Sequence, residues 1–189
     1  MAAGDRAVVE AVVAAAFGEP PDGRVVRMMR ALADSGAART GLVAVADGTV
    51  VGHAGLSRGW IDARRGLVEV LVLSPLSVRP DVQRTGVGST LVAAVLKAAG
   101  AGGAPAVFLE GDPKYYGPRG FGPGSAAGFE PPSVRIPGPA FQVAVLPGFQ
   151  PWMSGRLVYP DAFWSTDTVG LRDPFLAQVE AAMSPPGAA

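Results

Sequence analysis

The chain has 189 residues, enough for one domain with a sizeable core and too few for two. Apolar residues make up 49% of the sequence and charged residues 17%, which excludes a solvated, disordered chain. Sixteen basic side chains balance sixteen acidic ones, so no overall field attracts nucleic acid or a membrane surface, and we predict neither as a partner.

The sequence contains no cysteine and a single histidine, His53. This composition excludes disulfides, cysteine nucleophiles and metal sites built from thiolates or several histidines, and we predict no metal. Residues 1–17 lack the basic start of a signal peptide, and their apolar part is too short to span a bilayer. We therefore expect a cytoplasmic protein.

The first half of the chain predicts two helices and then a hairpin. Residues 7–17 and 24–36 have apolar side chains at helical spacing, and Gly36 is suited to a C-terminal cap. Two β-rich runs then surround Asp47 and Gly48, the residue pair that favours a tight type I′ turn.

Residues 66–78 are apolar on both faces, which indicates a strand at the centre of a sheet. Pro75 interrupts the hydrogen-bond ladder of this strand, so we expect a bulge or a splay there. Residues 86–100 predict a helix that buries Leu91 and Val95, and residues 105–111 predict another buried strand.

The second half is rich in glycine and proline. Residues 117–139 show no periodicity, which predicts a long loop outside the core. Residues 140–147 and 154–160 predict two strands, which we expect to pair antiparallel with each other.

The stretch VRPDVQRTGVGSTL, residues 78–91, joins the central strand to the following helix. A helix N-terminus offers unpaired backbone N–H groups and a partial positive charge, so glycines at this point suit a phosphate. The dinucleotide fingerprint would need a glycine where Leu91 stands, and the Gly-Lys-Ser/Thr of a P-loop is absent. The pattern Gln/Arg-x-x-Gly-x-Gly/Ala does match, from Gln83 to Gly88.

With this pattern, and with Tyr116 placed ahead of Gly120-Phe121, the sequence resembles the GCN5-related N-acetyltransferases (GNAT), and within them the YhbS-like bacterial subgroup. The resemblance covers most of residues 5–163. It implies an α/β fold with a mixed, mostly antiparallel central sheet, helices on both faces and a splay at the cofactor site. We expect one such domain over residues 1–163, then a C-terminal extension, residues 164–189, with a short helix at 173–183 and a frayed end.

The resemblance implies acetyl-CoA as co-substrate. Backbone groups of Leu76 and Val78 would pair with the pantetheine arm, and N–H groups of the turn would hold the pyrophosphate. Arg79 and Arg84 would add charge, or are solvated surface residues. The implied cofactor-binding residues are Leu76, Ser77, Val78, Arg79, Gln83, Arg84, Thr85, Gly86, Val87, Gly88, Ser89 and Tyr116.

The family's reaction is direct attack of a neutral amine on the acetyl thioester in a ternary complex. The resemblance suggests the Val78 N–H as the donor to the oxyanion and the Tyr116 phenol as the proton donor to the departing thiolate. The alternative for Tyr116 is packing under the loop, a role for which Tyr115 is the better candidate.

The general base is left open. Many members carry a glutamate six positions before the residue that matches Val78, and here that position is Val72. Glu69 would act as the base if it were buried, and His53 is a natural base by residue type. The alternatives are an exposed Glu69 at the start of the strand and a His53 packed in the core. Glu110 and Asp112 suit a cationic substrate or a turn cap.

We therefore predict an N-acetyltransferase that acts on an amine of a small molecule or a peptide. The rivals are a CoA-binding or partner-binding module without turnover and a different phosphate-binding protein. The sequence leaves the oligomeric state open, and a homodimer is one alternative. The family usually begins with a strand before its first helix, and the sequence predicts none here.

Overall fold

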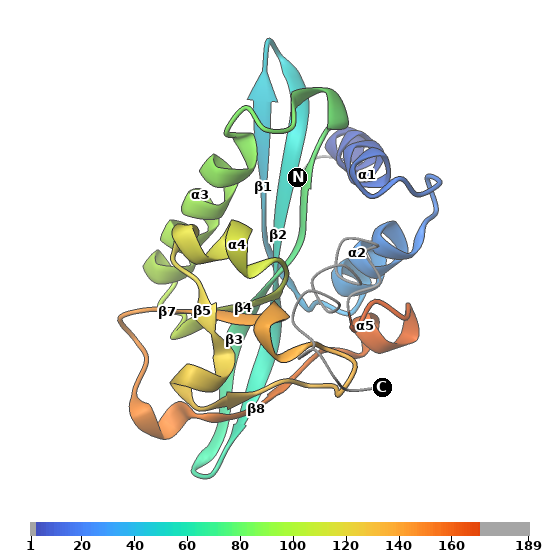
Figure 1. Ribbon diagram of the computed structural model, residues 1–189. Coiled ribbons are helices and arrows are strands. Elements are labelled where there is room, and N and C mark those ends of the chain that lie inside the picture. The colour runs from blue at the N-terminus through green and yellow to red at the C-terminus, as the bar shows by residue number, and fades with distance from the viewer. Residues whose placement is uncertain (1–2, 171–189) are drawn as a thin grey trace, which may run out of the picture.

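A computed structural model describes residues 3–170 (Figure 1). The helices are α1 (Ala3–Phe17), α2 (Arg24–Asp34), α3 (Val87–Ala101), α4 (Pro113–Tyr116) and α5 (Asp161–Ser165). The strands are β1 (Ala38–Ala46), β2 (Thr49–Ala63), β3 (Gly66–Val78), β4 (Ala106–Glu110), β5 (Gly122–Pro123), β6 (Phe129–Glu130), β7 (Phe141–Val145) and β8 (Gly155–Val158). Within the described residues, α1 comes first and the first strand follows α2.

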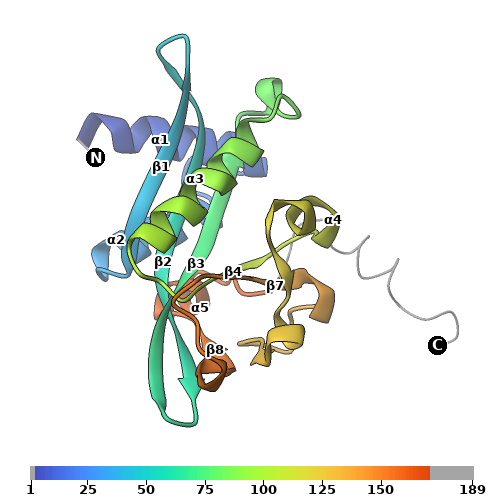
Figure 2. The ribbon, with the colours of Figure 1, turned by 90° about the vertical axis from the view of Figure 1, so that its left-hand side faces the viewer.

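The strands form one mixed sheet in the order β5-β7-β4-β3-β2-β8-β6, and β1 also pairs with β2. Neighbouring strands run antiparallel except β3 with β4 and β6 with β8. Helices α1 and α2 lie on one face of the sheet and α3 lies on the other (Figures 1 and 2). The predicted α/β fold, with its mostly antiparallel sheet and helices on both faces, is confirmed.

The predicted hairpin turn joins β1 to β2. Asp47 and Gly48 both have positive φ, 48° and 74°, as the two central residues of a type I′ turn require. Strands β2 and β3 then pair over almost their whole length, from Gly52↔Val78 to Ala63↔Gly66. This long hairpin carries the end of β3 to the turn before α3.

The core fills both sides of the sheet, because β2, β3 and β4 are covered on each face. On the side that we call the α2 side, Met28 and Leu32 pack with Val70, Val72 and Phe108. On the opposite, α3 side the cluster includes Leu56, Leu73, Leu91, Val95 and Leu109. Successive residues of a strand point to opposite faces, so this division tells which side each residue of β3 and β4 faces.

The prediction that residues 140–147 and 154–160 pair with each other is wrong. Strand β7 lies between β4 and β5, and β8 pairs with the end of β2 at Ala63↔Gly155. The first four residues of β7 are all buried, so it fits inside the sheet. Only one of the four residues of β8, Leu157, is buried, and this strand fits where β2 projects beyond β1.

The prediction of a long loop outside the core is wrong in part. Residues 117–139 contain the short strands β5 and β6, and Phe121, Phe129 and Ile136 are buried in the core. These side chains enter the core one at a time between glycines and prolines, so no helical or strand period marks them in the sequence.

The packed region runs past residue 163. Ala162 and Phe163 of α5 and then Val169 are buried on the α2 side of the sheet. The helix predicted at 173–183 lies outside the described residues. Within residues 3–170, no helix has the length and apolar character that a membrane crossing needs.

Candidate active site

Strands β3 and β4 separate where the sequence predicts a splay. They pair in parallel at Leu71↔Val107 and Val72↔Phe108, after which β3 continues to Val78 beside β2 alone. The register with β2 shifts between Ala54 and Leu56, opposite the cis peptide bond between Ser74 and Pro75. The result is an opening in the middle of the sheet, bordered by the end of β3 and the end of β4.

The backbone of β3 presents two amide groups to this opening. The Arg79 N–H donates to the Val51 carbonyl of β2 at 2.8 Å, and Ser77 is the partner of His53 in the same ladder. Because backbone groups alternate between the two edges of a strand, the N–H and C=O groups of Leu76 and Val78 point away from β2. An extended chain in the opening can pair with them as another strand would.

The β3 edge leads into the start of α3. Gly86 is the N-cap residue with a φ of 98°, and no side chain of the described residues caps the helix there. Arg84 also has a positive φ, 63°, so the turn curls its backbone back toward the helix end. The N–H groups of Val87, Gly88 and Ser89 form the uncapped first turn, which suits an anion.

Tyr116 reaches the same region from β4. Helix α4 follows the end of β4, and a Cβ atom on Gly111 would overlap the Tyr116 ring. The ring packs edge-on against Phe121, with centroids 5.7 Å apart, in the α3-side cluster. Burial raises the pKa of Tyr116 well above its ordinary value, so its phenol stays protonated at physiological pH.

Contacts that were not predicted from the sequence join the segment from Tyr115 to Arg119 to the start of α3. The Nε and Nη2 atoms of Arg119 donate to Ser89 Oγ at 3.0 and 2.8 Å, and Nη1 donates to the Tyr115 carbonyl. The Arg119 guanidinium lies 3.8 Å from the centroid of the Tyr115 ring. A Cβ atom on Gly88 would overlap the Tyr115 hydroxyl, so Tyr115 lies at the turn itself. The one available signal was the position of Arg119 within YYGPRGF.

The comparison with known families shows which family this chain belongs to. The model of the acetyltransferase (GNAT) family matches residues 9–117, more than half of the chain. This chain belongs to the GNAT family. The matched region contains the opening in the sheet, the turn before α3 and Tyr116.

Solved GNAT structures share the fold. GNAT family N-acetyltransferase YhbS from Escherichia coli, in complex with CoA, has a TM-score of 0.77 at 22% identity over 92% of each chain. A GNAT family acetyltransferase from Brucella melitensis, in complex with acetyl-CoA, has a TM-score of 0.68 at 28% identity, covering 86% of this chain and 94% of that one. A search of curated proteins found no match.

Other residues of the GNAT turn are held locally. Arg79 forms two hydrogen bonds to Asp81, both at 2.7 Å, which lower the pKa of Asp81. Gln83 donates to the Val78 carbonyl at 3.0 Å, and Thr85 donates to the Val82 carbonyl at 2.7 Å. Arg84 is exposed. These bonds hold Arg79, Gln83 and Thr85 within the turn, whereas the Arg84 side chain projects into solvent.

The structure places Glu69 away from this GNAT site. Its carboxylate is 45% exposed and accepts a hydrogen bond from Arg39 Nε at 3.1 Å. It lies nine residues before Val78, roughly 30 Å along the strand. Glu69 and Arg39 line a separate cavity of about 330 Å³ beside the C-terminal end of α3.

His53 and Asp112 have structural surroundings. His53 is 3% exposed, and burial lowers its pKa to about 4, so the ring is neutral at pH 7. Its Nδ1 atom has no hydrogen-bond partner within residues 3–170. Asp112 accepts a hydrogen bond from the Lys114 N–H at 2.8 Å and so caps α4. The described residues contain no group of three or more His, Asp or Glu side chains that could hold a metal ion.

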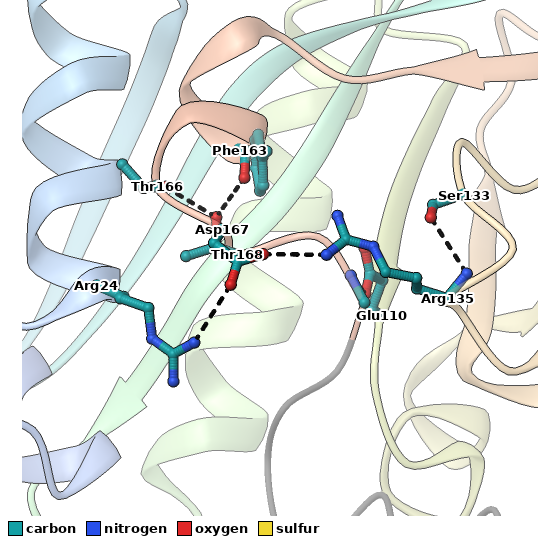
Figure 3. Close-up of polar contacts among 9 residues, drawn as sticks. Arg24, Glu110, Ser133, Arg135, Phe163, Thr166, Asp167 and Thr168 are labelled. Carbon is teal, nitrogen blue, oxygen red and sulfur yellow. Dashed lines mark hydrogen bonds and ion pairs between the residues drawn. The ribbon is translucent and has the colours of Figure 1, made fainter.

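Glu110 lies at the end of β4, on the border of the opening. The Tyr159 hydroxyl donates to its Oε1 atom at 2.8 Å, and the Gly170 N–H donates to its Oε2 atom at 3.1 Å. Burial raises the pKa of Glu110 to about 7, although both hydrogen bonds and the charge of Arg135 act in the opposite direction. Arg135 in turn donates to Asp167 at 3.0 Å (Figure 3).

Proposed function

We propose that this protein is an N-acetyltransferase that moves an acetyl group from acetyl-CoA to an amine of a small molecule or a peptide. The observation that carries the proposal is the continuous backbone surface that runs from the outward-facing amides of Leu76 and Val78 to the uncapped first turn of α3. The relatives from Escherichia coli and Brucella melitensis, crystallised with CoA and acetyl-CoA, support it.

In this proposal the pyrophosphate lies on the turn from Arg84 to Ser89. Gly86 and Gly88 let the oxygens approach the backbone N–H groups closely. The pantetheine arm leaves the turn and runs along β3 into the opening. It reaches Val78 first and Leu76 last, so we assign the pantetheine amide to Val78 and the thioester carbonyl to the Leu76 N–H. This assignment differs from the expectation from sequence, which gave the carbonyl to Val78.

The amine nitrogen attacks the thioester carbon, a C–N bond forms, and the C–S bond breaks with its electron pair going to sulfur. A fixed backbone N–H stabilises the oxyanion in between. Tyr116 donates its proton to the thiolate. Burial disfavours the phenolate, but it disfavours the thiolate as well, so the difference between the two acids changes less than either pKa.

The acceptor must lose a proton before it attacks. A lysine-like amine has a pKa of about 10.4, so only a few molecules in ten thousand are neutral at pH 7. The small neutral fraction adds roughly 4–5 kcal/mol to the activation free energy, which a nearby base can offset.

Calorimetric titration with acetyl-CoA tests the cofactor site. Native protein is expected to bind at micromolar levels, and Gly86→Glu is expected not to bind, because a side chain and a negative charge enter the anion site. Gly103→Glu is the matched control: Gly103 also has a positive φ, 77°, has open space around a Cβ atom, and lies beyond the other end of α3. If native protein does not bind acetyl-CoA, or if both variants bind as native protein does, the proposed site is wrong.

A CoA-binding module without turnover is the second candidate. It is favoured by one observation, namely that Val72, at the family's usual base position, is 1% exposed and packed in the core. Such a module would bind acetyl-CoA and transfer nothing to any amine.

A further inference from the structure

A carboxylate lies on the β4 side of the opening, just beyond the last paired residues, Val72 and Phe108. Val72 is paired in register with Phe108 of β4, and both side chains lie in the α2-side core. Glu110 is two residues after Phe108 on the same strand, so its side chain faces the same side of the sheet. Compared with Val72, the family's usual base position, Glu110 therefore lies on the neighbouring strand and two residues further along, where β3 and β4 have separated.

We propose that Glu110 is the general base that takes the proton from the acceptor's ammonium group, an inference that rests on the proposed acetyl transfer. The carboxylate is held by Tyr159 on one oxygen and by the Gly170 N–H on the other. Its side chain is only partly exposed, at the border of the opening. A base held in this way keeps its position while the acceptor enters.

The surroundings of Glu110 set its basicity near neutrality. Burial raises its pKa, while the Tyr159 hydroxyl, the Gly170 N–H and the positive charge of Arg135 lower it. Arg135 is itself paired with Asp167 (Figure 3). A base whose pKa lies close to the working pH is ionised in a large fraction of the molecules and still accepts a proton readily.

Acid and base lie on opposite faces of the opening. Tyr159, the partner of Glu110, packs in the α2-side core, whereas Tyr116 packs in the α3-side cluster. An amine that enters from the α2 side passes Glu110, and the sulfur leaves toward Tyr116. This arrangement separates the group that must be ionised from the group that must stay protonated.

The proton balance follows. Glu110 takes one proton from the ammonium group, which leaves the neutral amine, and later releases this proton to solvent. After attack the nitrogen carries a second surplus proton, which replaces the one that Tyr116 gives to sulfur. Each turnover thus yields the amide, the free thiol of CoA and one proton.

The test measures kcat/KM from about pH 5 to about pH 10 with the best acceptor from a panel of primary amines, namely peptides with free N-termini, lysine peptides and aliphatic polyamines. Native protein is expected to lose activity below a pH of about 7, where Glu110 becomes protonated. Glu110→Gln is expected to lower kcat/KM at neutral pH by about 10²- to 10⁴-fold. The kcat/KM of this variant should rise with pH as a larger fraction of the acceptor amine becomes neutral. Its affinity for acetyl-CoA should be unchanged.

Tyr159→Phe is the second variant. It removes a hydrogen bond that lowers the pKa of Glu110, so the acidic limb of the pH profile is expected to move to higher pH. Glu130→Gln is the matched control, because Glu130 is 61% exposed and pairs only with the surface residue Arg156 among the described residues. Its profile should match that of native protein.

The outcomes separate the two proposals. Unchanged kcat/KM and an unchanged acidic limb in Glu110→Gln would overturn the role of Glu110 and leave acetyl transfer standing. Loss of acetyl-CoA binding in this variant, or an unmoved limb in Tyr159→Phe, would likewise show that Glu110 is a structural residue. If native protein binds acetyl-CoA and acetylates no amine of the panel, acetyl transfer itself fails, and the base with it.

Discussion

Individual residues at this site are placed by contacts that the sequence does not display. Tyr116 is recognisable from its spacing to Gly120-Phe121, but its position against Gly111 depends on the fold. Arg119 and Tyr115 meet Ser89 and Gly88 across roughly thirty positions of sequence, and no local pattern encodes such a pairing. Their role at the turn therefore emerged only from the structure.

At this scale the decisive substitution is Tyr116→Phe. It removes the phenol proton and keeps the ring that packs on Phe121. We expect kcat to fall by about 10²-fold or more, because the departing thiolate loses its proton donor. The dissociation constant for acetyl-CoA, measured by calorimetry, should stay within about twofold of the native value, since the turn is untouched.

An unchanged kcat in Tyr116→Phe would show that another group protonates the sulfur. If native protein binds acetyl-CoA and neither protein transfers it, the module without turnover is the correct assignment. The same pair of proteins thus distinguishes an enzyme from a binding module.

Elements were predictable where a local rule applied. The Asp47-Gly48 turn, the apolar β3 and the glycine-led start of α3 each have a pattern of their own, and all three are present. The pairing of residues 140–147 with 154–160 was predicted from chain order alone. This prediction failed because a strand can join only an edge that the other strands leave free. The free edges depend on the order of all strands in the sheet, which chain order alone does not give.

The alternation along β3 makes a prediction for hydrogen exchange. Ser77 and Arg79 direct their N–H groups to β2, whereas Leu76 and Val78 direct theirs to the opening. Without cofactor we expect the amides of Leu76 and Val78 to exchange much faster than those of Ser77 and Arg79. Acetyl-CoA should protect Leu76 and Val78 selectively, as measured by NMR.

Equal protection of all four amides before acetyl-CoA is added would mean that the edge is already covered. If acetyl-CoA binds, as confirmed by calorimetry, and the amides of Leu76 and Val78 gain no protection, the pantetheine arm does not lie along β3. Either result would revise the proposed path of the cofactor.

Two buried groups influence the stability of the whole molecule in opposite directions. Between a pH of about 4.5 and about 7 the folded protein keeps a proton on Glu110 that the unfolded chain has released, so Glu110 makes stability fall as pH rises. Between a pH of about 4 and about 6.5 the unfolded chain holds a proton on His53 that the folded protein does not, so His53 makes stability rise with pH.

The two contributions nearly cancel where they overlap, so the free energy of unfolding of native protein should change little between about pH 4.5 and pH 6.5. Glu110→Gln removes one of them, and we expect its free energy of unfolding to rise by about 3 kcal/mol across this interval. Urea unfolding at several pH values measures the free energy of unfolding of native protein and of Glu110→Gln. The lowered pKa of Glu10 beside Arg30 adds stability that is lost only as the pH falls below this interval.

Glu130→Gln is again the control and should stay as flat as native protein. A flat curve for Glu110→Gln would show that His53 does not titrate as described, and flat curves for both proteins would show that neither buried group does. A falling curve for native protein would show that His53 is protonated in the folded state.

The opening between β3 and β4 has a consequence for how a family of such proteins can diverge. It is bordered by two strands whose register, Val72↔Phe108, turns corresponding side chains toward the same face. A proton acceptor can therefore be gained on one strand and lost from the other during descent, with the cofactor surface on β3 and α3 left intact. The absence of an acid at one position is then poor grounds for declaring such a chain inactive, because the neighbouring strand offers an equivalent place.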